Sequence, residues 1–166
     1  MRIARLPEVC VVYIHRTLPG EEREILLGRK KTGLGRGHLV APGGKIEAGE
    51  TPEDAAVREV REEVGLAISR SALNLIGELT YPFPHRPEWS QKSWAFTADD
   101  PGGHAIESEE LAPEWVRVSE LPLDQMWDDA KYWLPASLRG VFTRATFSFG
   151  TDGLTVESSD HPEFGR

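Results

Sequence analysis

The sequence predicts a single α/β domain in which short β-strands surround one strongly marked helix. The length of 166 residues fits one domain and leaves little room for two. The chain is 39% hydrophobic and 28% charged, a composition typical of a globular domain with a buried core. Strand-like apolar runs alternate with helical patterns, and neither a repeat nor a linker interrupts them. We therefore expect one domain over residues 1–166.

The first 44 residues predict strands joined by turns and a basic loop. Apolar, β-branched runs bounded by turn residues indicate strands at 9–14, 24–27 and 38–41. The first two flank a Leu-Pro-Gly turn and are expected to form a hairpin. The segment KKTGLGRG, residues 30–37, predicts a glycine-rich basic loop.

A helix is predicted from residue 52 to residue 64. Thr51 can cap its first turn, Pro52 suits its first position, Asp54 completes a variant of the capping box, and Gly65 ends it. An apolar stripe at helical spacing indicates the buried face. The residues of that stripe are Ala55, Ala56, Val60 and Val64.

The remainder of the chain predicts further strands and a second helix. Strands are expected at 73–83, 93–97, 114–118, 145–149 and 154–158, and a helix at 129–139. The last two strands flank Gly-Thr-Asp-Gly, a hairpin signal. We expect an ordered core over about 8–158 and a frayed tail over 159–166.

Composition narrows the classes of function. The chain contains no run of about 18 apolar residues, which a membrane span would need, and the N-terminus lacks the apolar region of a secretory signal. Cys10 is the only cysteine, so the sequence predicts neither an internal disulfide nor a cysteine metal cluster. We expect a cytoplasmic protein.

The net charge of -8 and the lack of an obvious basic face argue against a nucleic acid polymer as partner. An acidic protein that binds a polyanion needs a bridge, usually a divalent cation.

The predicted central helix carries three glutamates at positions i, i+3 and i+4. Glu59, Glu62 and Glu63 should project from one side of the helix, where like charges destabilise it. One interpretation is a solvated face neutralised by Arg58 and Arg61. The other is a cation held between the carboxylates, for which the hard Mg²⁺ ion is suited. The preceding Pro-Gly-Gly turn favours the second interpretation, because it exposes backbone carbonyls beside the helix.

The same segment resembles a known family. The Nudix box, here residues 44–66, specifies nine positions, and this chain fills all of them. They are Gly44, Glu50, Arg58-Glu59-Val60, Glu62-Glu63 and Gly65-Leu66, separated in turn by five, seven, one and one residues. The resemblance implies a Nudix hydrolase, which cleaves nucleoside diphosphates linked to another moiety. It also implies an α/β/α sandwich with a mixed central sheet, in which the box forms a catalytic loop–helix–loop.

The resemblance assigns roles within the box. It implies metal ligation by Glu59, Glu62 and Glu63, with a backbone carbonyl of Gly43 or Gly44. Arg58 resembles the family arginine that pairs with the box glutamate, here Glu50, and orients the metal carboxylates. The expected cofactor is Mg²⁺, with Mn²⁺ as an alternative. Glu63 and the distant Glu110 are both candidates for the catalytic base, because the sequence gives no distances.

Outside the box the chain is similar to the MutT-like oxidised-purine nucleoside triphosphatases, from about residue 9 to residue 158. Segments 28–35, 106–115 and 126–135 carry this likeness. It implies hydrolysis of 8-oxo-dGTP or a related purine triphosphate to the monophosphate and pyrophosphate. The substrate-binding residues that it implies are Lys30 for a phosphate or the sugar, Trp127 and Asp129 for the base, and Tyr81 and Phe83 to close the base pocket. Core packing is the alternative for Trp127, and the favoured interpretation for Trp133.

Two positions depart from the subfamily. Val40 stands where the subfamily has an asparagine that reads the base, and Ala130 stands where it has a second aspartate. The alternative enzymatic substrates are ADP-ribose, NADH or a nucleotide sugar, and the alternative class is a noncatalytic nucleotide-binding module. A monomer and a homodimer are both compatible with the sequence.

Overall fold

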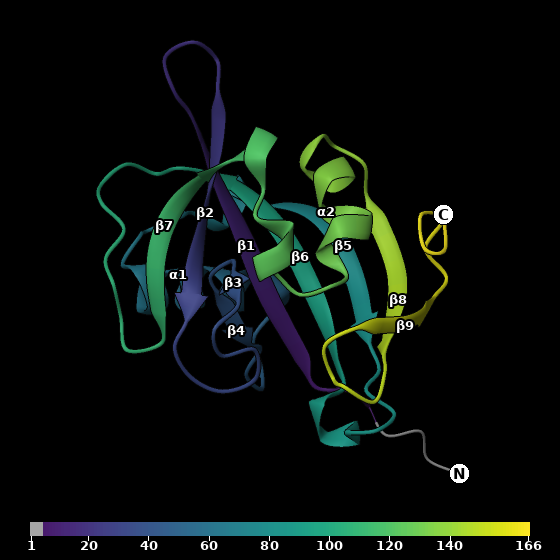
Figure 1. Ribbon diagram of the computed structural model, residues 1–166. Coiled ribbons are helices and arrows are strands. Elements are labelled where there is room, and N and C mark those ends of the chain that lie inside the picture. The colour runs from purple at the N-terminus through teal and green to yellow at the C-terminus, as the bar shows by residue number, and fades with distance from the viewer. Residues whose placement is uncertain (1–4) are drawn as a thin grey trace.

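A mixed β-sheet lies between two helices in the computed structural model, which describes residues 5–166 (Figure 1). Neighbouring strands follow the order β3–β2–β1–β6–β5–β8–β9, while β4 also pairs with β1 and β7 with β2. The strands are β1 (Glu8–Thr17), β2 (Arg23–Lys30), β3 (Leu39–Val40), β4 (Gly43–Lys45), β5 (Asn74–Tyr81), β6 (Gln91–Asp99), β7 (Leu111–Arg117), β8 (Thr143–Phe149) and β9 (Val156–Ser159). The helices are α1 (Pro52–Val64) and α2 (Ala130–Leu138).

The sheet combines parallel and antiparallel pairs. β1 runs parallel to β6 and β5 parallel to β8, whereas β1 and β2 form the predicted antiparallel hairpin. Because β1 also pairs with β4, the segment that leads into α1 is attached to a central strand. The catalytic helix expected from the sequence is thereby fixed on the sheet.

Each face of the sheet carries its own hydrophobic core. On β1, Cys10, Val12 and Ile14 are buried with the apolar stripe of α1, whereas Tyr13 is buried with α2. The α2 side chains in that second core include Trp133 and Leu134, as expected for Trp133. The α/β/α sandwich is confirmed. Within residues 5–166, neither helix has the length and apolar character needed to cross a membrane.

The ends of α1 follow the local sequence signals. The Thr51 hydroxyl accepts from the Asp54 amide at 3.1 Å, and the Asp54 carboxylate accepts from the Thr51 amide at 3.2 Å. Gly65 has φ 71° and ends the helix in the left-handed conformation. Both predicted boundaries are confirmed.

The structure differs from the sequence expectation in three places. Residues 43–45 form a strand that was not predicted, because Gly-Gly-Lys shows no apolar pattern. β7 begins at Leu111 rather than at residue 114, and this brings its first residue beside Lys30 of β2. In the segment where we expected a frayed tail, Phe164 packs edge-on against Tyr132 with ring centroids 5.4 Å apart.

Candidate active site and metal centre

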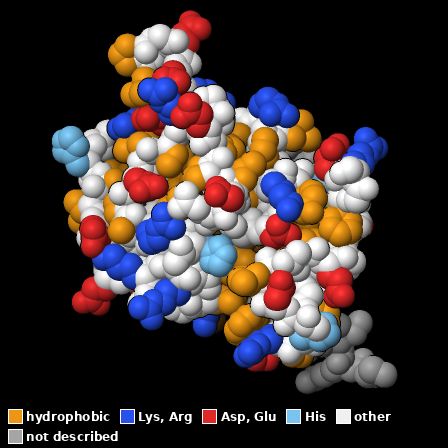
Figure 2. All heavy atoms as spheres, in the orientation of Figure 1, with side chains coloured by type: hydrophobic (Ala, Val, Ile, Leu, Met, Phe, Trp, Pro, Cys, Tyr) orange, Lys and Arg blue, Asp and Glu red, His pale blue; other side chains and the backbone are white. Residues whose placement is uncertain are grey.

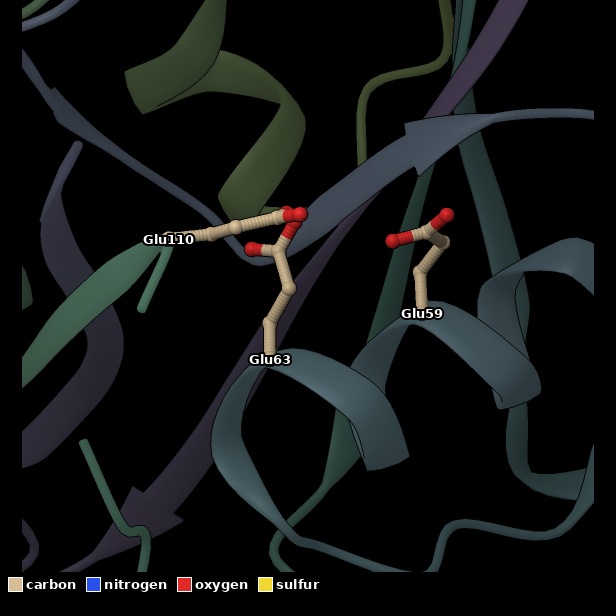
Figure 3. A group of neighbouring side chains, drawn as sticks. All are labelled: Glu59, Glu63 and Glu110. Carbon is tan, nitrogen blue, oxygen red and sulfur yellow. The ribbon is translucent and has the colours of Figure 1, made fainter. Parts of the chain in front are cut away.

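Three glutamates from two separate segments come together beside β4 (Figure 3). Glu59 and Glu63 lie on successive turns of α1, and Glu110 comes from the segment before β7. Each offers a carboxylate oxygen, and these oxygens lie within 4.8 Å of one another. Glu59 and Glu63 are buried, whereas Glu110 is exposed. We call these three residues the carboxylate cluster.

Glu62 lies outside the carboxylate cluster. Residues four apart on a helix are rotated by about 40°, whereas residues three apart are rotated by about 60° in the other direction. The Glu62 side chain is accordingly 58% exposed and accepts from Arg58 at 3.2 Å. It lines the rim of an acidic pocket of about 270 Å³ together with Glu63, Ser108, Glu109 and Glu110. The structure therefore brings together Glu59, Glu63 and Glu110, and sets Glu62 apart at the pocket edge.

The two glycines of β4 allow the loop to approach the carboxylates. A Cβ atom on Gly44 would lie 2.5 Å from the carboxyl carbon of Glu59, and one on Gly43 would lie 1.9 Å from the carbonyl oxygen of Cys10. A side chain on Gly43 would collide with the backbone of β1, and one on Gly44 would force the Glu59 carboxylate to move. The Gly43 amide donates to Glu63. The backbone of β4 thus forms one wall of the carboxylate cluster.

Arg58 connects the buried and exposed glutamates. Its Nε and Nη2 donate to the two oxygens of Glu50 at 2.8 and 2.9 Å, a bidentate pair. Its Nη1 donates to Glu59 at 2.8 Å, and its Nη2 also donates to the Lys45 carbonyl at 2.9 Å. The pKa of Glu50 is lowered to about 2, mainly by its hydrogen bonds with Arg58. One guanidinium therefore fixes the loop, the helix and a cluster carboxylate relative to one another.

Burial and mutual repulsion oppose ionisation in the carboxylate cluster. The pKa of Glu63 is raised to about 8, first by burial and then by Glu59 and Glu110, against the opposing effects of the Gly43 amide and Lys30. Burial also raises the pKa of Glu59, although Arg58 opposes this. Three oxygen donors that repel one another are suited to a hard divalent cation. The donor set therefore fits a metal ion.

We expect the metal-free protein to lose stability between about pH 5 and pH 8. Glu63 in the folded chain keeps a proton to about pH 8, whereas the unfolded chain releases it near pH 4.5, so rising pH favours unfolding across this window. Ligands must be deprotonated to bind metal, so Mg²⁺ should raise the melting temperature more at pH 8 than at pH 5.5. Each 1 kcal/mol corresponds to about 2–4 °C for a domain of this size.

Thermal melts in EDTA and in Mg²⁺ across this pH range test the expectation. The control is Glu63→Gln, in which the pH-dependent loss should shrink while contributions from other groups remain. An unchanged pH dependence in this variant would contradict the assignment to Glu63.

The segment that carries Glu110 is attached at two points. The Lys31 amide donates to the Glu110 carbonyl at 2.9 Å, and its ammonium donates to the Ser108 carbonyl at 2.8 Å and pairs with Glu107. At the end of α1, the Ile106 amide donates to the Val64 carbonyl at 2.9 Å. Lys31 and the helix end together hold Glu110 against Glu63.

Aromatic side chains gather on the α2 side of the sheet. The rings of Phe83 and Phe149 stack with centroids 4.7 Å apart, and Trp127 is nearly perpendicular to both, with centroid distances of 6.1 and 5.5 Å. Behind them Asp129 is buried, and one of its oxygens accepts from Tyr81 and from the Trp133 indole, each at 2.8 Å. Burial raises the pKa of Asp129. The structure thus brings together the four residues expected around a base.

Lys30 joins the carboxylate cluster to the aromatic group. Its positive charge acts on Glu63. Its main chain is hydrogen-bonded to His38 at 2.9 Å, and the His38 ring stacks on Trp127. Sequence reasoning missed His38 as a site residue, because the stack joins two loops far apart in sequence, and it also missed Phe149, which was expected only as part of a strand.

The two positions that depart from the subfamily differ in their surroundings. Val40 packs with the α1 core, on the side of the sheet opposite Leu39, which belongs to the α2 core. Ala130 is buried in the α2 core. Neither position supplies a hydrogen-bonding side chain to the aromatic group.

The fold, the nine matched box positions and the carboxylate cluster define a family. The chain matches the NUDIX domain over residues 6–137 and belongs to the Nudix hydrolase family, as the sequence predicted. It is 38% identical to the oxidized purine nucleoside triphosphate hydrolase of Mus musculus over 119 residues, which is 72% of this chain and 74% of that protein. It is 37% identical to the protein of the same name from Danio rerio over 133 residues, which is 80% of this chain and 83% of that one.

A solved structure supports the same fold. The MutT protein from Bacillus halodurans superposes with a TM-score of 0.73, covering 93% of this chain and 96% of that one at 24% identity. The predicted resemblance to the Nudix family, and to its oxidised-purine triphosphatases, is therefore confirmed.

Proposed function

We propose that this chain hydrolyses purine nucleoside triphosphates, in particular oxidised ones such as 8-oxo-dGTP, to the nucleoside monophosphate and pyrophosphate. The observation that carries the proposal is the carboxylate cluster lying next to an aromatic group, with Lys30 and His38 between them. Such a site offers a charged end for a polyphosphate and an apolar end for a base. The names of the mouse and zebrafish relatives support the choice of substrate.

Glu59, Glu63 and Glu110 would hold a divalent cation, for which we propose Mg²⁺, with Mn²⁺ able to replace it. When bound, the cation supplies positive charge that neutralises the polyphosphate and acts as a Lewis acid. We propose that Glu62, which lines the acidic pocket, and the Gly44 backbone, which lies against Glu59, complete the ligand set. Arg58 keeps the Glu59 carboxylate oriented.

The proton acceptor is one of two glutamates. Glu63 and Glu110 both line the acidic pocket, so either carboxylate can take the proton from a water molecule that attacks phosphorus. The new bond joins the water oxygen to phosphorus and the bond to the bridging oxygen breaks, so that pyrophosphate leaves after attack at the α-phosphorus and the nucleoside monophosphate leaves after attack at the β-phosphorus. Lys30 provides a positive charge near Glu63 for the phosphate chain. Hydrolysis in ¹⁸O-labelled water identifies which phosphorus is attacked.

The base is proposed to bind at the aromatic group. Stacking of a base on an aromatic side chain contributes about 1–3 kcal/mol. Trp127 is partly exposed and provides such a surface, while Phe83 contacts it and Tyr81 lies behind, against Phe149. Asp129, whose pKa is raised by burial, can face the base edge as acceptor or, when protonated, as donor. Its bonds to Tyr81 and Trp133 fix its orientation.

A hydrolysis panel with Mg²⁺ tests the proposed function. The substrates are 8-oxo-dGTP, 2-hydroxy-dATP, the four normal dNTPs, ADP-ribose, NADH and a nucleotide sugar. We expect the highest kcat/KM for an oxidised purine triphosphate, with pyrophosphate as a product. Turnover of only the diphosphate-linked compounds would overturn the proposal in favour of another Nudix substrate. Binding without turnover of any compound would indicate a nucleotide-binding module.

A further inference from the structure

One face of Trp127 is covered by the imidazole of His38. The two rings are parallel to within 1°, and their centroids are 4.6 Å apart. Parallel stacking at this distance is the arrangement that an aromatic base would adopt on the indole.

The edges of two stacked phenylalanine rings also point towards Trp127. Phe83 and Phe149 are stacked on each other, 4.7 Å apart, and Trp127 is 6.1 Å from one and 5.5 Å from the other. A ring nearly equidistant from two stacked rings lies beside the stack. The indole is inclined by 78° and 80° to the two rings, so neither phenylalanine is stacked on it. Among the described residues, His38 is the aromatic side chain that stacks on a face of Trp127.

The main chain of His38 is fixed by backbone hydrogen bonds, and its side chain is held by the stack and by one further hydrogen bond. The His38 amide donates to the Gly35 carbonyl at 2.9 Å, and its own carbonyl accepts from the Lys30 amide at 2.9 Å. The imidazole Nδ1 donates to the Gly35 carbonyl at 3.1 Å. The side chain is half-buried, and rotation about its first dihedral angle would break this bond and take the ring off the indole.

The loop of His38 is also attached to the segment of Trp127. Arg29 donates to the Gly37 carbonyl at 2.9 Å and to the Gln125 side chain at 2.7 Å. A Cβ on Gly35 would lie 3.0 Å from the Trp127 ring, so the glycine permits this close approach. These contacts do not involve the His38 side chain, so its rotation would not break them.

We propose that His38 occupies the place of the substrate base on Trp127, so that a nucleotide binds by displacing the imidazole. This inference rests on the proposed function, since it takes Trp127 as the surface for the base. When a side chain of the protein covers the binding surface, only the fraction of molecules in which it has moved away can bind a ligand. The apparent dissociation constant of every ligand is then the intrinsic constant divided by that fraction. His38 thus sets affinity uniformly and does not select among bases.

The test is His38→Ala, measured as KM and kcat for several nucleoside triphosphates. One aromatic stack changes an equilibrium constant by about 2- to 10-fold, so KM should fall by about that factor, equally for purines and pyrimidines that stack on Trp127. In a Trp127→Ala background, which itself should raise the KM for purines, the same substitution should have no effect on KM, because the shared surface is gone. His104→Ala, at an exposed histidine of another loop, is the control.

A direct measurement accompanies the kinetics. The His38 ring protons in the free protein lie over the indole and carry its ring-current shift in an NMR spectrum, and a saturating purine monophosphate should remove that shift. A raised KM in His38→Ala, or a factor that differs between bases, would overturn the proposal by making His38 a direct contact of the substrate. If the wild-type chain hydrolyses no purine triphosphate, the proposed function fails. If it hydrolyses them while His38→Ala leaves KM unchanged, only the displacement fails.

Discussion

Glu63→Gln should lower kcat by about 10²- to 10⁴-fold while the protein remains folded. Glu63 lies on α1 and, like Glu110, belongs both to the carboxylate cluster and to the acidic pocket, so it can contact the metal and the attacking water. Glutamine keeps the shape and removes the charge. Because repulsion from Glu59 and Glu110 opposes ionisation at this position, the variant should melt at the same or a higher temperature in EDTA at pH 8.

Two comparisons make this prediction specific. Glu53→Gln, in the first turn of the same helix, should retain wild-type turnover. Glu62→Gln should have a smaller effect than Glu63→Gln, since Glu62 is exposed and outside the carboxylate cluster. Near wild-type turnover in Glu63→Gln would contradict the site assignment, and so would a larger loss in Glu62→Gln.

Arg58→Ala should reduce both activity and stability. It removes the guanidinium that holds Glu50, Glu59 and the Lys45 carbonyl, and leaves the buried Glu59 without its cation. Breaking a fully buried pair costs about 3–5 kcal/mol, and the partial exposure of Arg58 reduces this to roughly 1–3 kcal/mol. We expect kcat/KM to fall by at least about 10²-fold, since a carboxylate of the proposed metal site loses its orientation.

Two variants serve as controls for Arg58→Ala, one that keeps the charge and one at another position of the same helix. Arg58→Lys keeps the charge but loses the bidentate contact with Glu50, so it should restore only part of the activity and stability. Arg61→Ala, at an exposed arginine of the same helix, should change neither. Urea unfolding and a Mn²⁺ titration measure the two effects, and equal Mn²⁺ affinity in wild type and Arg58→Ala would argue against the orienting role.

Local sequence signals predicted α1 well because its ends depend on neighbouring residues. Thr51 and Asp54 bond across three positions, and Gly65 ends the helix through its own φ angle. β4 was missed because its strand character comes from pairing with β1, more than 30 residues earlier in the chain, and not from its own residues. A contact of that kind leaves no pattern in a short stretch of sequence.

The same distinction applies to the candidate site. The helical period put three glutamates on one side of α1, but it could not show that Glu59 and Glu63 face β4 while Glu62 faces solvent. Glu110 is a candidate site residue only through the family resemblance, since no pattern in its own segment identifies a ligand. On the face in Figure 2, both acidic and basic side chains are exposed.

The two-point attachment of the Glu110 segment has a consequence for heat inactivation. Ahead of β7, the segment is held by Lys31 and by the amide of Ile106, whose side chain is 60% exposed, whereas Glu59 and Glu63 belong to a helix packed on the sheet. Segments held by few buried contacts open at a lower free-energy cost than the core does. Catalysis should therefore cease on warming before the sheet melts, and a bound metal ion, by joining Glu110 to α1, should bring the two temperatures together.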